Sequence, residues 1–280
     1  MNEALLGHFF PPKAAFSPPS QSEATNLGSL SHQGKIALAL SWSFSLSAPG
    51  PDGIPYLTWN QVNAINPSIL LQILSPLVSL GYHPALLKGA NGVVLDKPGK
   101  LSYESHSSFR IIVLLRTVSK ILERIIAARL LLAARSRGLI HPNKYGSLPG
   151  LSTYDACLTI MNYMEIVHRP RLKVSSLFLD VKPGFDNVNN PTLARILQEG
   201  GIPHYLVSWV ASFLAEGSST LVFHGAPGTP VPVKVGARQG SPISPLLFLI
   251  YVSPLHFGIL RGLMLSYVDD FALTTASLSY

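Results

Sequence analysis

The sequence predicts an α+β fold in which a small antiparallel sheet packs on helices, and three observations support this. Apolar residues recur at helical spacing over several stretches, one of which begins at Thr117. Two strand-like runs, Met264–Val268 and Phe271–Thr275, are separated by only two residues, which is typical of a hairpin. With 280 residues, of which 47% are hydrophobic and 12% charged, the chain can bury a large core.

Composition excludes several classes of protein. The high apolar content excludes a wholly disordered chain and a solvated coiled coil. The single cysteine, Cys157, excludes an internal disulfide framework and any zinc or iron–sulfur site that needs several cysteines. The first residues lack the basic start and the long apolar stretch of a signal peptide, so we expect an intracellular protein, nuclear or cytoplasmic.

The most apolar run, Ile243–Leu260, raises the question of a membrane span. Serine, proline and histidine residues interrupt this run, whereas a bilayer helix needs about 20 mostly apolar residues. A buried core segment explains the run, so we expect no membrane partner. The positive mean hydropathy of the chain keeps a membrane-associated protein as an alternative.

The N-terminal third contains one unpatterned segment and three predicted elements. We expect residues 1–47 to form a mobile lead-in, since their first two thirds are rich in serine, proline and small residues. The run Ala48–Ile54 is typical of a turn, and a helical pattern extends from Trp59 to Leu80. Gly92–Lys100 predicts a short strand that enters a basic turn.

The middle of the chain alternates helices with loops. A helix should begin at Thr117, which can cap it, and end before Gly138. His141–Thr153 is rich in turn residues and predicts a loop, and Tyr154–His168 is again helical. Val174–Asp180 has the pattern of a buried strand that ends on a carboxylate.

The next segment begins with a clear helix signal. Asn190 can cap a helix whose first residue is Pro191, and Gly200-Gly201 should stop it. Leu221–His224 and Val231–Val235 predict two short strands around a turn.

The net charge of +7 is concentrated in one segment. Residues 94–150 contain ten lysines and arginines and three acidic residues, so the rest of the chain is neutral. Such a segment indicates either a solvated surface helix or a contact with a polyanion, where clustered cations displace counterions from phosphates. Charge alone leaves both interpretations open.

Three carboxylates carry the sharpest chemical hypothesis. Asp180 ends one predicted strand, and Asp269 and Asp270 lie at the turn between two others. An isolated Asp-Asp pair is usual in turns, but strands of one sheet can bring all three together. Clustered carboxylates repel one another unless cations neutralise them, and their hard oxygen atoms suit Mg²⁺. Two such ions would support phosphoryl transfer.

Several motifs resemble, in order, the blocks of reverse transcriptases, and most of all those of non-LTR (LINE-type) retrotransposons. The palm-like blocks are Phe178–Asp186, Arg238–Pro242 and Tyr267–Asp270. The upstream blocks, which look like an N-terminal block, the fingers and a further block, are Pro49–Ile54, Lys97–Lys100, Ser108–Leu130, and Asn143–Gly146 with Ser152-Thr153. The resemblance covers about residues 48–280.

The resemblance implies a right-hand polymerase and a two-metal site. Residues 48–150 would be the basic fingers and 151–280 the palm, within a reverse transcriptase domain of about 90–280. Asp180 and Asp269 would hold two Mg²⁺ ions, which Mn²⁺ could replace, with Asp270 as the third carboxylate. The backbone carbonyl of Val181 would complete one ion's shell.

The resemblance also implies a nucleotide pocket and nucleic-acid partners. Phe185 would exclude a ribose 2′-hydroxyl, although the same residue fits a core position after a turn. Gln239 and Gly240 would line the pocket, and Arg110 and Lys97 would neutralise the triphosphate. The partners would be dNTPs, an RNA template and a DNA primer, beside whose phosphates the basic segment would lie.

Some residues depart from the family pattern. Pro183-Gly184, Ile111, Ser147 and Leu151 replace residues that are usual there. The sequence ends ten residues after Asp270, so we expect the primer grip, the thumb and any endonuclease to belong to a longer parent protein. Two functions therefore stand: an active reverse transcriptase, or an inactive retrotransposon remnant or repurposed nucleic-acid-binding module.

Overall fold

The computed structural model describes residues 32–43, 47–100, 102–105, 108–168, 172–181, 185–215, 217–223, 226–233, 240–258 and 262–277. Residues 1–31 and 44–46 of the expected lead-in lie outside these residues. The expectation is wrong for the helix α3 (His32–Ser41), because its Ile36, Ala39 and Leu40 are buried in the core. The strands are β1 (Gly89–Asp96), β2 (Phe109–Leu115), β3 (Lys144–Tyr145), β4 (Lys173–Asp180), β5 (Gly217–Phe223), β6 (Ala226–Val233), β7 (Leu263–Tyr267) and β8 (Asp270–Ser277).

Helices outnumber strands among the described residues and form most of the core. The α-helices are α3 (His32–Ser41), α4 (Tyr56–Ile65), α5 (Ser68–Ser79), α6 (Thr117–Ser136), α7 (Thr153–His168), α8 (Asn190–Glu199), α9 (His204–Leu214), α10 (Ser244–Tyr251) and α11 (Ser253–Phe257). The short 3₁₀ helices are η1 (Ala85–Lys88) and η3 (Phe185–Asn187).

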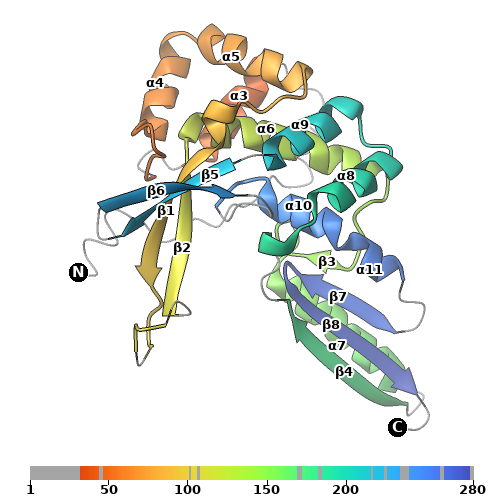
Figure 1. The fold of residues 1–280 in the computed structure, drawn as a ribbon. Helices are drawn as coiled ribbons and strands as arrows, with labels where there is room; N and C mark the ends of the chain where they lie inside the picture. The colour runs from red at the N-terminus through yellow and green to blue at the C-terminus, as the bar shows by residue number, and fades with distance from the viewer. Residues whose placement is uncertain are drawn as a thin grey trace.

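The strands form two separate four-stranded sheets, which extend from opposite ends of the helical body (Figure 1). The first sheet has the order β2–β1–β5–β6 and the second the order β3–β7–β8–β4. The predicted α+β class is confirmed. The expectation of a purely antiparallel sheet is wrong. Each sheet is mixed, because β1 pairs with β5 and β3 pairs with β7 in parallel, and the other pairs are antiparallel.

The two sheets draw strands from both halves of the chain. The β5–β6 hairpin joins the first sheet beside β1, although more than a hundred residues separate β1 from β5. The short strand β3, which lies in the expected loop His141–Thr153, joins the second sheet beside β7. The boundary that we expected at residue 150 therefore does not coincide with the division between the sheets.

The helix expected over Trp59–Leu80 is two helices, so that prediction is wrong. The helices α4 and α5 meet at 110°. Pro67 lies at the junction, where its ring disfavours helical geometry at Asn66 and removes a backbone donor. The second helix also contains Pro76 but continues to Ser79.

The long helix α6 is the centre of the core. Fourteen of its 20 residues are buried, so the interpretation as a solvated surface helix is wrong. It contacts α3, α4, α5 and α10. Thr117 does not cap it, because its hydroxyl donates to the Ile54 carbonyl at 2.7 Å. Gly138 does lie just beyond the end, with a positive φ of 66° and its N–H donating to Arg135.

The predicted start and end signals of α8 are correct to within one residue. Asn189, not Asn190, is the cap, and its side-chain oxygen accepts from Thr192 N–H at 2.9 Å. Pro191 lies in the first turn, and Gly201, with a φ of 68°, follows the end of the helix. The helix α7 begins one residue before the predicted start.

The strand β4 is not buried as its sequence predicts. It is the edge strand of the second sheet, and Leu177, Phe178 and Leu179 are 52%, 68% and 48% exposed. On the first sheet the edge strand β6 contains three prolines, which lack the N–H that would pair with another strand.

The described part of the apolar run near residue 250 is largely buried in the core. The run forms two helices, α10 and α11, which are separated at Val252. Five consecutive residues of α10, Leu246–Ile250, are buried. In the part of the chain that the structure describes, no single helix has the length and apolar character needed to cross a membrane. The bent pair α4–α5 meets that test only when both helices are taken together.

Candidate active site

The hairpin predicted from the two apolar runs is present, and its turn is unusual. The strands β7 and β8 pair in antiparallel register up to Tyr267 and Asp270, which leaves Val268 and Asp269 as the turn. Val268 has a φ of 56°, a conformation that is strained for a β-branched residue. Its N–H donates to the Tyr145 carbonyl at 3.1 Å, and its side chain packs on the main core. These contacts hold the strained turn in one conformation.

The segment around β3 supports the turn from one side. Gly146 has a φ of 74°, and a Cβ at this position would lie 2.7 Å from Val268 Cγ2. Ser266 N–H also donates to the Asn143 carbonyl at 3.2 Å. The block Asn143–Gly146 therefore acts here by positioning the acidic hairpin.

The sheet register brings the three acidic residues to one end of the second sheet. Asp180 is the direct cross-strand partner of Asp270. Val181 N–H donates to the Asp269 carbonyl at 3.3 Å, which ties the end of β4 to the turn. Side chains of cross-strand partners point to the same face. Asp180 and Asp270 are exposed, and Asp269 is half-buried.

The donor set suits Mg²⁺, although the side chains do not converge. Carboxylate oxygens are the ligands that Mg²⁺ prefers, and three aspartates on adjacent backbone positions supply them. Among the described residues, no group of three or more His, Cys, Asp or Glu side chains is arranged to hold a metal ion. The backbone therefore fits such a site, and side-chain rotation would have to complete it.

Phe185 lies on η3 beside this end of the sheet, and its ring packs inward. The ring centroid is 4.9 Å from that of Phe248 on α10, and Phe185 is half-buried against the main core. Lys182–Gly184, with the unusual Pro183-Gly184 pair, lie outside the described residues.

The backbone at position 240 requires a glycine. Its φ is 97°, and a Cβ would lie 2.6 Å from the carbonyl oxygen of Val113 on β2. The turn before α10 therefore touches the backbone of the first sheet. Gln239 lies outside the described residues.

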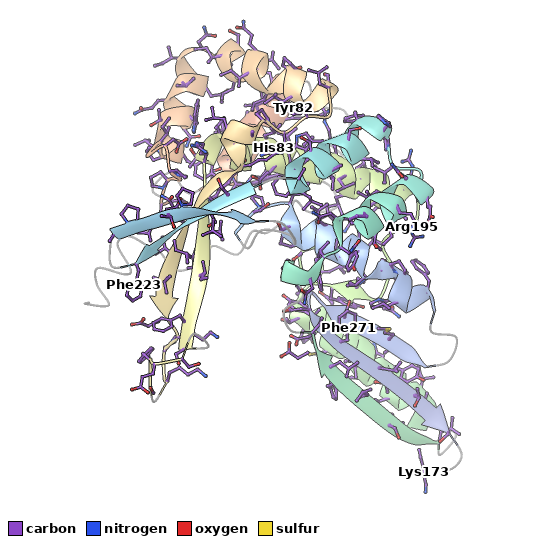
Figure 2. The ribbon with its side chains drawn as sticks, in the orientation of Figure 1. Tyr82, His83, Lys173, Arg195, Phe223 and Phe271 are labelled. Atoms are coloured by element: carbon purple, nitrogen blue, oxygen red, sulfur yellow. The ribbon has the colours of Figure 1, made fainter. Side chains whose placement is uncertain are left out.

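The two basic candidates belong to the first sheet or its edge, apart from the acidic hairpin: Arg110 lies on β2, and Lys97 directly follows β1. Arg110 is the cross-strand partner of Leu95. Lys97 is half-buried, and its N–H donates to the Ser108 carbonyl at 2.8 Å. In Figure 2 the label Phe223 marks β5 of the first sheet, and the label Phe271 marks β8 of the second sheet.

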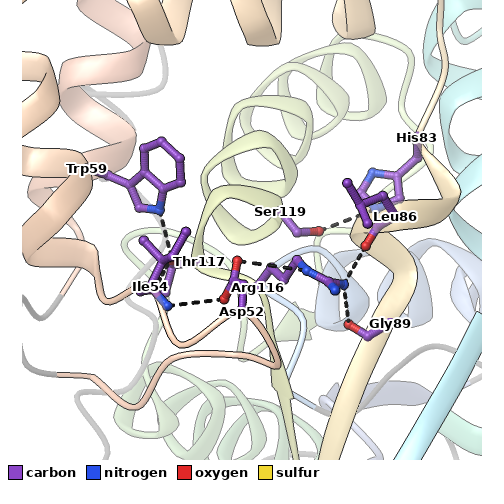
Figure 3. A network of polar contacts seen from close by, with 9 residues as sticks. All are labelled: Asp52, Ile54, Trp59, His83, Leu86, Gly89, Arg116, Thr117 and Ser119. Atoms are coloured by element: carbon purple, nitrogen blue, oxygen red, sulfur yellow. Dashed lines mark hydrogen bonds and ion pairs between the residues drawn. The ribbon is translucent and has the colours of Figure 1, made fainter. Parts of the chain in front are cut away.

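Sequence patterns gave no indication of the polar network at the start of α6 (Figure 3). Arg116 lies 3.9 Å from the Asp52 carboxylate and donates to the Leu86 carbonyl. Trp59 Nε1 donates to Thr117 Oγ1 at 2.8 Å. A Cβ on Gly50 would lie 2.5 Å from Arg116 N. These contacts hold the Pro49–Ile54 block against the start of α6. In the sequence, the block was marked only by its closely spaced turn-forming residues.

A buried basic cluster beneath the hairpin was also missed. Lys144 is 1% exposed, and its Nζ lies 3.4 Å from Ser266 Oγ and 5.8 Å from the Phe271 ring centroid. Burial lowers the pKa of Lys144 to about 7. Burial, with Lys144 and His141 nearby, lowers the pKa of His256 to about 3.

Comparison with known proteins finds relatives over most of the chain. A family model described as "Reverse transcriptase (RNA-dependent DNA polymerase)" matches residues 95–279. The chain is 27% identical over 237 residues to a probable RNA-directed DNA polymerase from transposon X-element of Drosophila melanogaster, covering 82% of this chain and 26% of that protein.

Two further relatives come from other mobile elements. The chain is 29% identical over 245 residues to the RNA-directed DNA polymerase from mobile element jockey of Drosophila melanogaster, covering 83% of this chain and 26% of that protein. It is 27% identical over 203 residues to a Pol polyprotein of the type-1 retrotransposable element R2 of Popillia japonica, covering 72% and 27%. The chain thus spans about a quarter of the length of these relatives.

Among solved structures, apo telomerase from Candida tropicalis has a similar fold. The TM-score is 0.50 at 13% sequence identity, and the match covers 80% of this chain and 44% of that chain.

Proposed function

Since the chain belongs to the reverse transcriptase family and is homologous to the reverse transcriptases of non-LTR retrotransposons, we propose that it extends a DNA primer along an RNA template during retrotransposition. The observation that carries this proposal is the pairing of Asp180 with Asp270 beside the Asp269 turn. In this proposal the first sheet belongs to the fingers and the second sheet to the palm of a right-hand polymerase.

We propose that Asp180 and Asp269 hold two Mg²⁺ ions, with Asp270 beside them and the Val181 carbonyl as a further ligand; Mn²⁺ is a candidate substitute. When bound, the ions would activate the primer 3′-hydroxyl and neutralise the departing pyrophosphate. The chain's own contribution is to fix the acidic residues, through the β4–β8 register and the Val268 turn. Such preorganised positioning supplies much of the rate of phosphoryl transfer.

The remaining candidates would bind the incoming dNTP. Gln239 and Gly240 would line its pocket, and Lys97 and Arg110 would approach its triphosphate from the fingers. The contact of Gly240 with the Val113 backbone supports this, because it joins the palm turn to the fingers strand β2. Phe185 would limit space at the ribose. Its packing on Phe248 fixes the ring, which suits a steric gate as well as a core position.

Primer extension tests the proposed function. The chain would be incubated with an RNA template, an annealed DNA primer, dNTPs and Mg²⁺, beside an Asp269→Asn variant. We expect the wild-type chain to extend the primer, and the variant to lose extension while it binds RNA nearly as well. If Asp269→Asn extended the primer as fast as the wild-type chain, the metal assignment would be wrong.

The alternative is an inactive remnant or a repurposed nucleic-acid-binding module. Two observations favour it: the acidic side chains do not converge on a metal position among the described residues, and the sequence has Pro183-Gly184 beside Asp180. In this case the chain would bind RNA in a salt-dependent manner without extending a primer.

A further inference from the structure

Glu123 is a carboxylate in the middle of the core helix α6, and it is fully buried. Ser119 Oγ donates to its Oε1 at 2.8 Å, and Ser241 Oγ donates to its Oε2. Burying a carboxylate costs several kcal/mol of folding free energy unless it is hydrogen-bonded. The two serine hydroxyls therefore offset the cost of burying Glu123. Ser241 belongs to the block that includes Gly240, more than a hundred residues along the chain.

The network continues to a third segment. The Ser119 hydroxyl has one proton, which it gives to Glu123, so it can only accept from His83 Nε2 at 3.3 Å. His83 is buried with its ring edge-on to Trp209 and Phe213 of α9, and Figure 3 shows it beside Ser119. The residues His83, Ser119, Glu123 and Ser241 are called the Glu123 network below.

The turn at Gly240 and Ser241 is held from two sides. On one side Gly240 lies against the Val113 carbonyl, so closely that only glycine fits. On the other side the Ser241 hydroxyl is fixed to Glu123. These contacts set the position of the turn against β2 and α6, and Gln239 is the residue immediately before it.

We propose that Glu123 is a positioning residue for the nucleotide pocket, and that it acts by fixing the turn at Gly240 and Ser241. This inference rests on the proposed function, because it takes Gln239 and Gly240 as residues that contact the incoming dNTP. A group whose only role is to fill the core would be apolar, since replacing buried polar networks by apolar side chains of the same shape is often neutral or stabilising. A charged acceptor at this place instead gives the turn one fixed position.

The variants that test this are Glu123→Gln and Ser241→Ala. Glutamine keeps the shape of the side chain but offers one acceptor oxygen in place of two, and alanine removes the donor on the turn. We expect either variant to raise the KM for dNTP about tenfold, the size of a lost hydrogen bond to a charged group, with kcat changed less than about twofold. The double variant should be no worse than the more affected single variant.

The matched control is Ser253→Ala. Ser253 is as buried as Ser241, and its hydroxyl accepts from His141 N–H at 3.2 Å, away from the Gly240 turn. Its loss should lower the thermal stability by a similar amount and leave the KM for dNTP unchanged. A rise in KM of the same size in this control would show that the Glu123 network acts only on stability.

Amide hydrogen exchange separates this inference from the proposed function, because it needs no activity. Peptides that cover Gly240 to Leu247 should exchange faster in Glu123→Gln and Ser241→Ala than in wild type, and at the wild-type rate in Ser253→Ala. If wild type extends no primer, the proposed function fails and the exchange result still decides whether Glu123 holds the turn. Unchanged exchange at the turn, or a loss of kcat at constant KM, would overturn the inference.

Discussion

At the scale of single residues, Lys144 has a pKa that makes stability depend on pH. Its folded-state pKa is about 7 and its unfolded value is near 10.5, because burial disfavours the ammonium. Between these values the unfolded chain binds one more proton, so the free energy of unfolding rises as pH increases. His256, with a pKa of about 3 against an ordinary 6.5, adds a loss of stability as pH falls below 6.5.

Replacing Lys144 with methionine should therefore raise stability near neutral pH. The apolar side chain fills a similar volume beside Phe271 and His256 without a proton to lose, at the cost of the contact with Ser266. We expect the free energy of unfolding of Lys144→Met, measured in urea, to change less between about pH 7 and about pH 9 than that of wild type. An equally steep rise in both proteins would mean that another group carries it.

Gly146 gives a second prediction at this scale. In Gly146→Ala the new Cβ meets Val268 Cγ2 at 2.7 Å in a backbone conformation that alanine rarely adopts, so the acidic turn must shift. We expect primer extension to fall at least tenfold, because catalysis depends on the position of reacting groups to within about 1 Å. Gly258→Ala is the control, since its nearest neighbouring atom is 3.6 Å away and its activity should be unchanged.

At the scale of elements, the cap of α8 can be measured directly. Asn189→Ala removes the acceptor for Thr192 N–H, and we expect a loss of about 1 kcal/mol in the free energy of unfolding. Asn187→Ala, at an exposed position two residues earlier, should change it by less than half of that. If chemical denaturation gave equal losses of unfolding free energy for both variants, the hydrogen bond of the Asn189 cap would contribute nothing beyond the effect of an alanine at this surface.

Elements with local signals could be predicted from the sequence, and elements that depend on distant partners could not. The hairpin of β7 and β8, the end of α6 before Gly138 and both ends of α8 follow from turn residues, caps and glycines a few residues away. The apolar run of β4 predicts burial, but its place at the sheet edge depends on pairing with β8, which lies about ninety residues later. The parallel pairing of β1 with β5 has no local signal of any kind.

The same division applies to the candidate site. The hairpin signal predicts that Asp269 and Asp270 lie together at a turn. Asp180 joins them only through the pairing of β4 with β8, which the sequence left as one arrangement that strands of one sheet can adopt. Glu123 and Arg116 were not predicted, since a charged residue in a helical pattern usually faces solvent. Their partners, Ser241 and Asp52, become neighbours only in the folded chain.

At the scale of the whole molecule, the basic excess is larger in the sequence than on the surface. Lys144 is buried, and Arg116 is engaged with Asp52 and the Leu86 carbonyl. Arg124 donates to the Ala39 carbonyl and Ser43 Oγ and lies 5.1 Å from the Tyr56 ring centroid. These three basic side chains are buried or engaged within the fold, so the number of phosphates bound should be well below the ten basic residues of the segment.

The salt dependence of RNA binding tests this view. Each phosphate contact contributes a slope of about −0.7 to the plot of log K against log salt for a single strand. Lys100 is exposed at the β1–β2 turn, so Lys100→Ala should make the slope shallower by about one contact. Arg124→Ala should lower the melting temperature and leave the slope unchanged, because its guanidinium is occupied within the fold. Fluorescence anisotropy with labelled RNA at several salt concentrations measures both slopes, and a shallower slope in Arg124→Ala would show that the buried face of α6 reaches RNA after all.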